Sequence, residues 1–339
     1  MPAKHDNCFG FLRFLFAIII VIAHLRVVSQ IPEFEITKVF SMAVNRTAFF
    51  VISGFLIMLS FDHSRDIKHF FTKRAKRIFP AYLTIIFICA IFLVFLSDYS
   101  AKDYFTHPMW WKYIAANVSF MNFIQPCLPG VFNSDIFTEC SVNGALWTQK
   151  VEVGFYLIVP LLAYILRRSK RAWVWLVGIY IFSVLWSNGC DFMEYKTGNS
   201  VWRFLEHQLP GCMSYFAAGM LAYQYKDIFF KYKNWLVIPA IIIVVIEKIY
   251  GLNWLLPAGN ATVLLWCAYS LTWLNSLEWL GDMSYGIYLY HFPILKVLFQ
   301  LGLFSIINIW IAAGVYILLV IALAAASWHL MEKRIIGRK

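Results

Sequence analysis

The sequence predicts an all-α protein that crosses a membrane about ten times. Hydrophobic residues make up 61% of the 339 residues, charged residues make up 14%, and mean hydropathy is +0.68. Soluble domains average about a quarter charged residues. The apolar residues also form blocks of about 17 to 25, the length that crosses ~30 Å of hydrocarbon. No soluble fold covers so much apolar surface with so few charges, so lipid is the solvent.

The apolar blocks give the spans in chain order, with a long loop over 98–145 after the third. The predicted spans are residues 11–29, 40–60, 80–97, 146–166, 172–188, 209–225, 234–250, 261–277, 284–301 and 304–328. Pro80 is expected to start the third span, because proline is tolerated in a first helical turn. The sixth contains Gly and Tyr throughout, and a broken or re-entrant segment is the alternative there. We expect one membrane-embedded domain over 1–339 without a fused soluble domain.

Basic clusters predict the orientation. Lys and Arg concentrate in the joints 61–79, 167–171 and 226–233 and in the C-terminal tail, whereas the opposite joints are acidic or mixed. Cytoplasmic joints carry such an excess of Lys and Arg. Both termini are therefore expected to be cytoplasmic, and the loop 98–145 is expected outside. The net charge of +11 is then a topology signal, and no nucleic-acid partner is expected.

Two of the seven cysteines, Cys127 and Cys140, lie in this outer loop. An oxidising exterior would let them form a disulfide, and two free thiols are the alternative. The sequence contains no CxxC pair, so we expect no structural zinc site.

Ionisable residues inside the spans are functional candidates, because each is costly in hydrocarbon unless it is paired or hydrated. Arg13 lies near the cytoplasmic end of the first span, and His24 lies roughly 16 Å farther along it. Glu152 lies in the outer turns of the fourth span, at a similar depth to His24. A carboxylate beside an imidazole fixes its tautomer and favours its protonated form, as a general base requires. The alternatives are a histidine hydrogen-bonded between helices and a glutamate paired with Lys150 or an arginine.

Arg74 and Arg77, three residues apart, share one helical face and form a fork suited to phosphate. A topology signal alone is the alternative. Ser53 and Gly54 interrupt a bulky apolar run and could make room for a thin ligand chain. Close helix packing is the alternative, and for Ser53 by itself the favoured one.

Together these segments resemble the acyltransferase-3 family of membrane acyltransferases, many of which O-acetylate cell-surface polysaccharides. The matching segments follow in order over nearly the whole chain: LRFLFAIIIVIAHL, FFVISGFLI, FTKRAKRIFPAYL, ALWTQKVEVGFYLIVPLL and LGDMSYGIYLYHFPIL. The resemblance implies ten helices in the bacterial inner membrane and transfer of an acyl group from cytoplasmic acyl-CoA to a glycan hydroxyl. Acetyl-CoA is the expected donor, as a co-substrate without a bound cofactor. Lipopolysaccharide O-antigen is the expected acceptor.

The resemblance implies that Arg13, His24, Arg74, Arg77, Trp147 and Glu152 are functional. The layout of the spans then suggests the roles of these and other residues as hypotheses. His24 is expected to remove the proton of the sugar hydroxyl while Glu152 orients His24 or stabilises its charged form. The alternative is that His24 is itself acylated. Donor binding is expected of Arg13, Arg74, Arg77, Ser53 and Gly54. Acceptor contact or structural support is expected of Trp147, Tyr285, Tyr288 and His291. The rival functions are a transporter or flippase of a lipid-linked sugar, which also uses buried charges, and a scaffold or sensor.

Overall fold

The computed structural model describes residues 7–40, 42–134 and 137–337, and these residues form helices and no strand. Six of the described helices are long and apolar enough to cross a membrane: Phe9–Ser29, Ile67–Leu96, Gly144–Arg168, Ala172–Thr197, Lys226–Tyr250 and Ile309–Ile336. The chain is thus an all-helical, multi-pass membrane protein. The total of ten spans and the cytoplasmic location of the termini stay predictions, and residues 1–6 and 338–339 lie outside the described residues.

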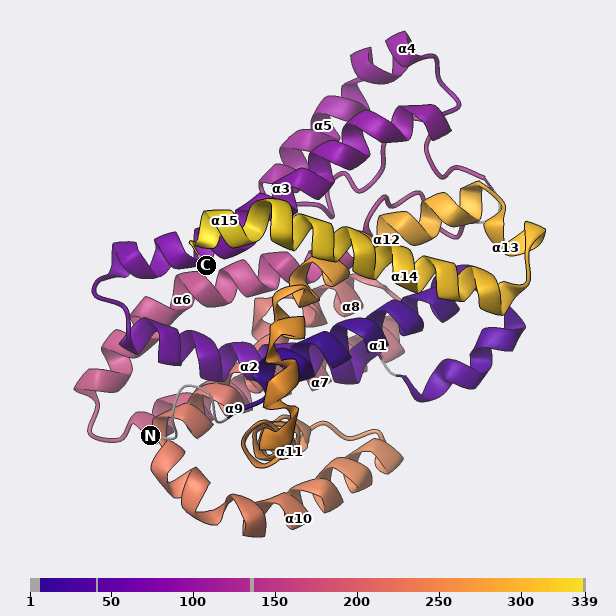
Figure 1. Cartoon of the computed structure of the whole chain (residues 1–339). Coiled ribbons are helices and arrows are strands. Elements are labelled where there is room, and N and C mark those ends of the chain that lie inside the picture. Colours follow the sequence, from indigo (N-terminus) through magenta and orange to yellow (C-terminus); the bar gives the residue numbers. More distant parts are fainter. Residues whose placement is uncertain (1–6, 41, 135–136, 338–339) are drawn as a thin grey trace. The chain divides into compact units, whose positions relative to one another are not determined.

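Figure 1 shows the helices in chain order. The elements are α1 (Phe9–Ser29), η1 (Pro32–Val39), α2 (Met42–Asp62), α3 (Ile67–Phe92), η2 (Leu93–Leu96), α4 (Ala101–Thr106), α5 (Pro108–Val118), η3 (Gly144–Leu146), α6 (Trp147–Arg168), α7 (Ala172–Thr197), α8 (Val201–Glu206), α9 (Leu209–Gln224), α10 (Lys226–Tyr250), α11 (Leu256–Ser270), η4 (Thr272–Asp282), α12 (Ser284–Gln300), α13 (Leu303–Ile306), α14 (Ile309–Ser327), η5 (Trp328–Glu332) and α15 (Lys333–Ile336). The η segments are 3₁₀ helices, except for η5, which is a π-helical turn.

The start of α3 corrects the prediction at Pro80, because Pro80 lies inside this helix. The helix begins at Ile67, where the Asp66 carboxylate accepts a hydrogen bond of 2.7 Å from the backbone N–H of His69. This bond satisfies one of the otherwise unpaired first-turn donors, and it lowers the pKa of the Asp66 carboxyl. The basic cluster is therefore part of the helix instead of a joint before it. Polarity led the sequence interpretation to treat these residues as loop.

Two late spans also differ from the prediction. The span expected at 261–277 is α11 followed by the 3₁₀ segment η4. The span expected at 304–328 divides into the short α13 and then α14, which begins at Ile309. The Asn308 side chain caps α14 by accepting a hydrogen bond of 2.9 Å from the backbone N–H of Trp310. The sixth predicted span is the continuous helix α9, so the broken-segment alternative is wrong.

The chain clusters into two compact units, each built from three separated stretches of sequence. Unit 1 combines residues of 1–12, 43–71 and 151–278, and unit 2 combines residues of 13–42, 72–150 and 279–339. The single membrane-embedded domain over 1–339 stays a prediction.

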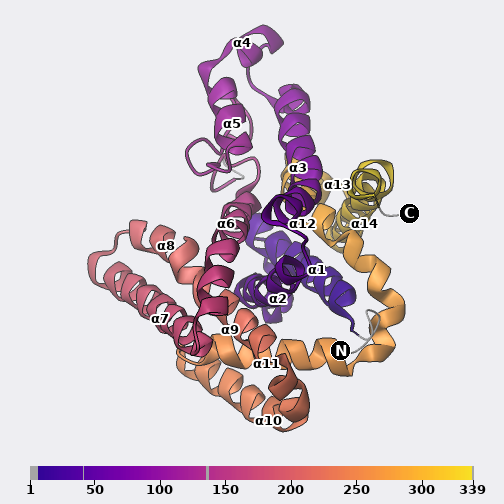
Figure 2. The same cartoon turned by 90° about the vertical axis from the view of Figure 1, so that its left-hand side faces the viewer.

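Close helix packing dominates unit 1. A Cβ atom at Gly54 in α2 would collide with the backbone oxygen of Phe216 in α9, and one at Gly219 in α9 would collide with the backbone oxygen of Val51. Small residues allow such backbone approach between membrane helices. The ring of Phe216 stacks on that of Phe155 in α6 at 4.1 Å between centroids. In the same unit α10 and α11 lie side by side, as Figures 1 and 2 show.

Polar ties between segments are prominent in unit 2. The carbonyl oxygen of Ala90, near the end of α3, accepts hydrogen bonds from Tyr104 Oη at 3.0 Å and from Trp110 Nε1 at 2.8 Å. The carbonyl oxygen of Asn117 in α5 accepts one from Tyr82 Oη in α3 at 2.7 Å. These bonds hold α4 and α5 beside α3 (Figure 2). In the same unit α12 packs on α14.

Candidate active site

The centre of the candidate site is a pair of imidazole rings, His24 in α1 and His291 in α12, both in unit 2. His291 Nε2 lies 3.2 Å from His24 Nδ1, and the ring centroids are 4.9 Å apart. His291 is fully buried, with 0% of its surface exposed, whereas His24 is half-buried. Of this histidine pair, His24 is therefore the member with exposed surface.

Pro293 explains how α12 is held around His291. Proline has no N–H, so the carbonyl oxygen of Leu289, four residues earlier, lacks its helical donor. Asn143 Nδ2 supplies the missing hydrogen bond at 2.9 Å. The Tyr316 hydroxyl on α14 donates another hydrogen bond, of 3.3 Å, to the carbonyl oxygen of His291. The backbone that carries His291 is thus fixed by side chains from two other segments.

Tyr288, one turn before His291, ties α12 to the start of α6. Its hydroxyl donates to the carbonyl oxygen of Ala145 at 2.7 Å and also contacts the hydroxyl of Thr148. Trp147, half-buried, is the first residue of α6. These contacts are consistent with structural support, one of the two roles predicted for Tyr288.

A second cluster surrounds Arg77 in α3. Its guanidinium carbon lies 5.7 Å from the ring centroid of Tyr285 and 5.6 Å from that of Trp328. Its Nη1 lies 3.9 Å from Glu332 Oε2, and the Glu332 side chain is 1% exposed. The Ser327 hydroxyl donates to the other oxygen of Glu332 at 2.9 Å. We call Arg77, Tyr285, Trp328 and Glu332 the Arg77 clamp.

Arg13 and Arg74 complete the basic residues predicted for this unit. Arg13 Nη2 donates a hydrogen bond of 2.9 Å to the carbonyl oxygen of Gly281, just before α12. Arg74 lies three residues before Arg77 on α3 and is half-buried. Tyr285 Oη in turn donates to the carbonyl oxygen of Ile78, which joins α12 to α3. Arg13, Arg77 and His24 thus each contact α12 or the segment just before it.

Three predicted site residues, Ser53, Gly54 and Glu152, belong to unit 1. Glu152 accepts a hydrogen bond from the hydroxyl of Tyr156, one turn later on α6. Its predicted role beside His24 stays a prediction. At Gly54 the backbone of α9 occupies the space that a side chain would need, so helix packing accounts for this glycine without a donor.

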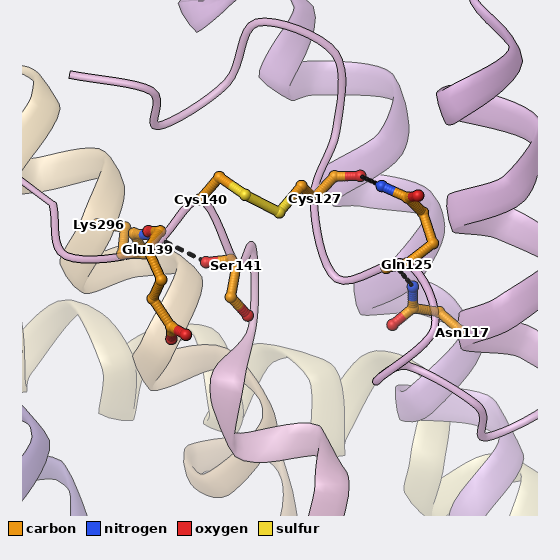
Figure 3. The surroundings of a disulfide bond; sticks show 7 residues. All are labelled: Asn117, Gln125, Cys127, Glu139, Cys140, Ser141 and Lys296. Carbon is orange, nitrogen blue, oxygen red and sulfur yellow. Dashed lines mark hydrogen bonds between the residues drawn. A yellow bond between two sulfur atoms is a disulfide. The ribbon is translucent and has the colours of Figure 1, made fainter. Parts of the chain in front are cut away.

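Cys127 and Cys140 form a disulfide in the structure, with 5.4 Å between their Cα atoms (Figure 3). Beside it, the buried Nζ of Lys296 in α12 donates to the carbonyl oxygens of Glu139 at 2.7 Å and Ser141 at 2.8 Å. The ammonium group also lies 4.7 Å from the ring centroid of Phe132. These contacts join the loop before Asn143 to the helix that carries His291. A disulfide is consistent with the predicted outer side of this loop.

The sequence interpretation did not identify several of these residues. It paired His24 with Glu152 and not with His291, which was assigned only acceptor contact or support. It counted Glu332 within a basic tail, although a carboxylate at the end of an apolar span is itself a signal of function. Asn143 gave no signal, because its role depends on a carbonyl group that Pro293 releases 146 residues away from it.

The fold is that of a multi-pass membrane protein. A family model described as "Acyltransferase domain" matches residues 6–330, and the chain therefore belongs to this acyltransferase family. This match confirms the resemblance found in the sequence. No solved structure matches the chain.

Several curated proteins are similar to this chain. It is 27% identical to the O-acetyl transferase of Shigella phage Sf6, over 98% of this chain and 97% of the relative. It is 25% identical to nodulation protein 10 of Rhizobium leguminosarum bv. viciae, over 97% of this chain and 93% of the relative. It is also 25% identical to peptidoglycan O-acetyltransferase OatA of Listeria monocytogenes, over 77% of this chain and 46% of the relative. These identities support an O-acetyltransferase.

Proposed function

We propose that the protein moves an acetyl group from cytoplasmic acetyl-CoA to a sugar hydroxyl of a cell-surface or lipid-linked polysaccharide. The carrying observation is the half-buried imidazole of His24, hydrogen-bonded to His291, in a chain that belongs to an acyltransferase family. The names of the similar O-acetyl transferases favour acetyl as the group and a glycan as the acceptor. We propose lipopolysaccharide O-antigen as this glycan and the bacterial inner membrane as the location.

The proposed chemistry uses His24 as a general base. Its free ring nitrogen removes the proton of the sugar hydroxyl as the oxygen attacks the carbonyl carbon of the thioester. The new C–O bond forms, the C–S bond breaks, and the CoA thiolate leaves. The proton held by His24 then passes to the thiolate, which restores the imidazole. In the alternative route His24 itself attacks the thioester, so a C–N bond forms as the C–S bond breaks. The sugar hydroxyl then attacks the acyl group on His24, forming the C–O bond as the C–N bond breaks and giving its proton to the released imidazole.

The Arg77 clamp supports anion binding at the donor end. A guanidinium held over two aromatic rings keeps its planar fork in one orientation, which suits phosphate oxygens. Arg74, one turn away, and Arg13 would add positive charge for the phosphates of CoA. The pantetheine arm is on the order of 15 Å long, similar to the roughly 16 Å of α1 between Arg13 and His24. Ser53 and Gly54 stay proposed donor contacts, and Glu152 stays the proposed group that stabilises the charged form of His24.

The test uses the full-length protein in proteoliposomes with labelled acetyl-CoA and lipid-linked O-antigen. We expect the wild type to label the glycan and His24→Ala to lower the rate by about 10²- to 10⁴-fold, the contribution of a positioned general base. His63→Ala is the matched control, because His63 is an exposed histidine at the end of α2 and should leave the rate unchanged. Equal labelling by wild type and His24→Ala would refute the site. Glycan translocation without any labelling would favour a flippase.

A further inference from the structure

The hydrogen-bond geometry of the histidine pair determines where its protons lie. His291 Nδ1 is 2.7 Å from the carbonyl oxygen of Tyr288. A carbonyl oxygen only accepts hydrogen bonds, so His291 Nδ1 carries the hydrogen. In a neutral imidazole the other nitrogen then has no hydrogen, so His291 Nε2 is an acceptor.

The same argument applies to His24. Its Nδ1 faces two acceptors, the carbonyl oxygen of Ile20 at 3.1 Å and His291 Nε2 at 3.2 Å. Only an N–H at this position satisfies both neighbours, as a shared donor. A lone pair on His24 Nδ1 would face two other lone pairs. The hydrogen of neutral His24 therefore lies on Nδ1, and Nε2 carries the lone pair.

We propose that His291 is a positioning residue that holds His24 in the tautomer whose Nε2 is the base nitrogen. This inference rests on the proposed function, because it assigns the nitrogen that takes the hydroxyl proton. Exposure supports the division of roles, since His291 is fully buried and His24 is half-buried. When Nε2 takes the proton, the Nδ1–H of the resulting imidazolium continues to donate to His291 Nε2 and Ile20. The hydrogen-bond acceptor, His291 Nε2, is thus in place before His24 becomes positively charged.

The local fold gives His291 the rigidity that this role needs. The Asn143 bond to Leu289 and the Tyr316 bond to His291 fix the backbone on both sides of the ring. Phe292 lies against His24, with ring centroids 5.5 Å apart and an interplanar angle of 78°. A histidine with one ring nitrogen hydrogen-bonded to a fixed neighbour keeps one tautomer and one ring orientation.

Two substitutions separate positioning from general structural support. In His291→Leu the acceptor for His24 Nδ1 is lost, and we expect kcat to fall by about 10- to 100-fold, as for other residues that orient a reactive group. The KM for acetyl-CoA should stay within about two-fold, because the Arg77 clamp is untouched. In His291→Gln the amide group can donate to Tyr288 while its oxygen accepts from His24. We therefore expect this variant to recover most of the lost kcat.

Leu295→Ala is the matched control for loss of packing, because Leu295 is 0% exposed and lies one turn after His291 on α12. It should lower Tm while kcat of the folded protein is retained. If His291→Gln and His291→Leu lower kcat equally, or if His291→Leu keeps the wild-type kcat, positioning by His291 is refuted.

A spectroscopic readout tests the tautomer without catalysis. Nitrogen-15 labelling of histidine in the full-length protein in bilayers distinguishes a protonated from an unprotonated ring nitrogen, and His24→Ala assigns the signal. We expect protonated Nδ1 and unprotonated Nε2 for His24 in the wild type, and a mixture of tautomers in His291→Leu. A protonated Nε2 in the neutral wild type would overturn the inference. Failure of the proposed function looks different, since the wild type then transfers no acetyl group whatever its tautomer.

Discussion

The two compact units use their buried atoms differently. In unit 1, glycines let the backbones of α2 and α9 touch, and the Phe155 and Phe216 rings stack beside them. In unit 2, buried polar side chains connect segments far apart in the sequence, as His24 does with His291 and Lys296 with Glu139. Buried polar groups are costly unless each has its partner. Unit 2 holds the histidine pair and the Arg77 clamp, so the proposed base and the proposed anion-binding group both lie there, whereas Glu152 is the proposed catalytic residue of unit 1.

The largest effect that tests this contrast is expected at Gly54. In Gly54→Ala the added methyl group collides with the backbone oxygen of Phe216, so α2 and α9 must move apart. We expect a loss of stability of about 3 kcal/mol, at the upper end of overpacking effects. Thermal unfolding measures the loss, and acetyl transfer per folded molecule measures function. If Gly54 acts in packing, the KM for acetyl-CoA of the folded fraction stays at the wild-type value.

The opposite outcome at Gly54 would break the comparison. A raised KM with unchanged thermal stability would assign donor binding to unit 1, as the sequence predicts. Gly178→Ala is the matched control, because a Cβ atom there meets nothing within 4 Å. It should leave both stability and KM near wild type.

The second effect concerns the disulfide of unit 2. A crosslink between residues separated by 13 positions stabilises a fold by about 2 to 3 kcal/mol, since it restricts the unfolded chain. We expect the double variant Cys127→Ser/Cys140→Ser to lose that stability, with a lower Tm in a thermal scan. Lys296 still holds the loop through Glu139 and Ser141, so acetyl transfer at low temperature should fall only a few-fold.

Reductant provides the control for the disulfide. It should lower the Tm of the wild type toward that of the double variant and leave the double variant unchanged. A Tm of the double variant equal to that of the oxidised wild type would show that Lys296 alone anchors the loop.

Helix boundaries were predictable from the sequence where apolar blocks end sharply. The first span was predicted at 11–29 and is Phe9–Ser29, and the ninth was predicted at 284–301 and is Ser284–Gln300. The start of α3 was not predictable, because an amphipathic helix whose first turns are basic resembles a charged loop in the sequence. Likewise Pro80 lies inside α3, although a proline ring usually interrupts a helix. Chain polarity thus predicts the apolar part of a helix better than its polar extension.

The sequence indicated which residues belong to the candidate site, but it did not indicate which of them contact one another. The cost of charge in lipid singled out Arg13 and His24, and the spacing singled out Arg74 and Arg77. The partner of His24 lies 267 residues away, and no local pattern encodes that contact. Similarly, Glu332 is the last residue of the π-helical turn η5, and a 3.6-residue period does not predict its place beside Arg77.

The smallest of these effects is expected in the Arg77 clamp, where two substitutions should change the KM for acetyl-CoA in opposite directions. In Arg77→Ala a charge-assisted contact to phosphate is lost, worth about 2 kcal/mol, so the KM for acetyl-CoA should rise about 30-fold with little change in kcat. In Glu332→Gln the carboxylate that faces Arg77 at 3.9 Å becomes neutral, while the amide oxygen still accepts from Ser327. Since this separation is too long for a hydrogen bond, Glu332 acts on Arg77 through its charge.

Neutral glutamine at 332 therefore leaves the guanidinium more attractive to an anion. We expect a KM for acetyl-CoA about three-fold lower, a change of ~0.7 kcal/mol. Steady-state kinetics with saturating acceptor measures both variants, and Arg77→Lys should fall between Arg77→Ala and wild type because it keeps the charge but loses the stacked fork. If Arg77→Ala lowers kcat as much as His24→Ala and leaves KM unchanged, the clamp belongs to the reacting centre. The division within unit 2 between an anion-binding end and a base end would then be wrong.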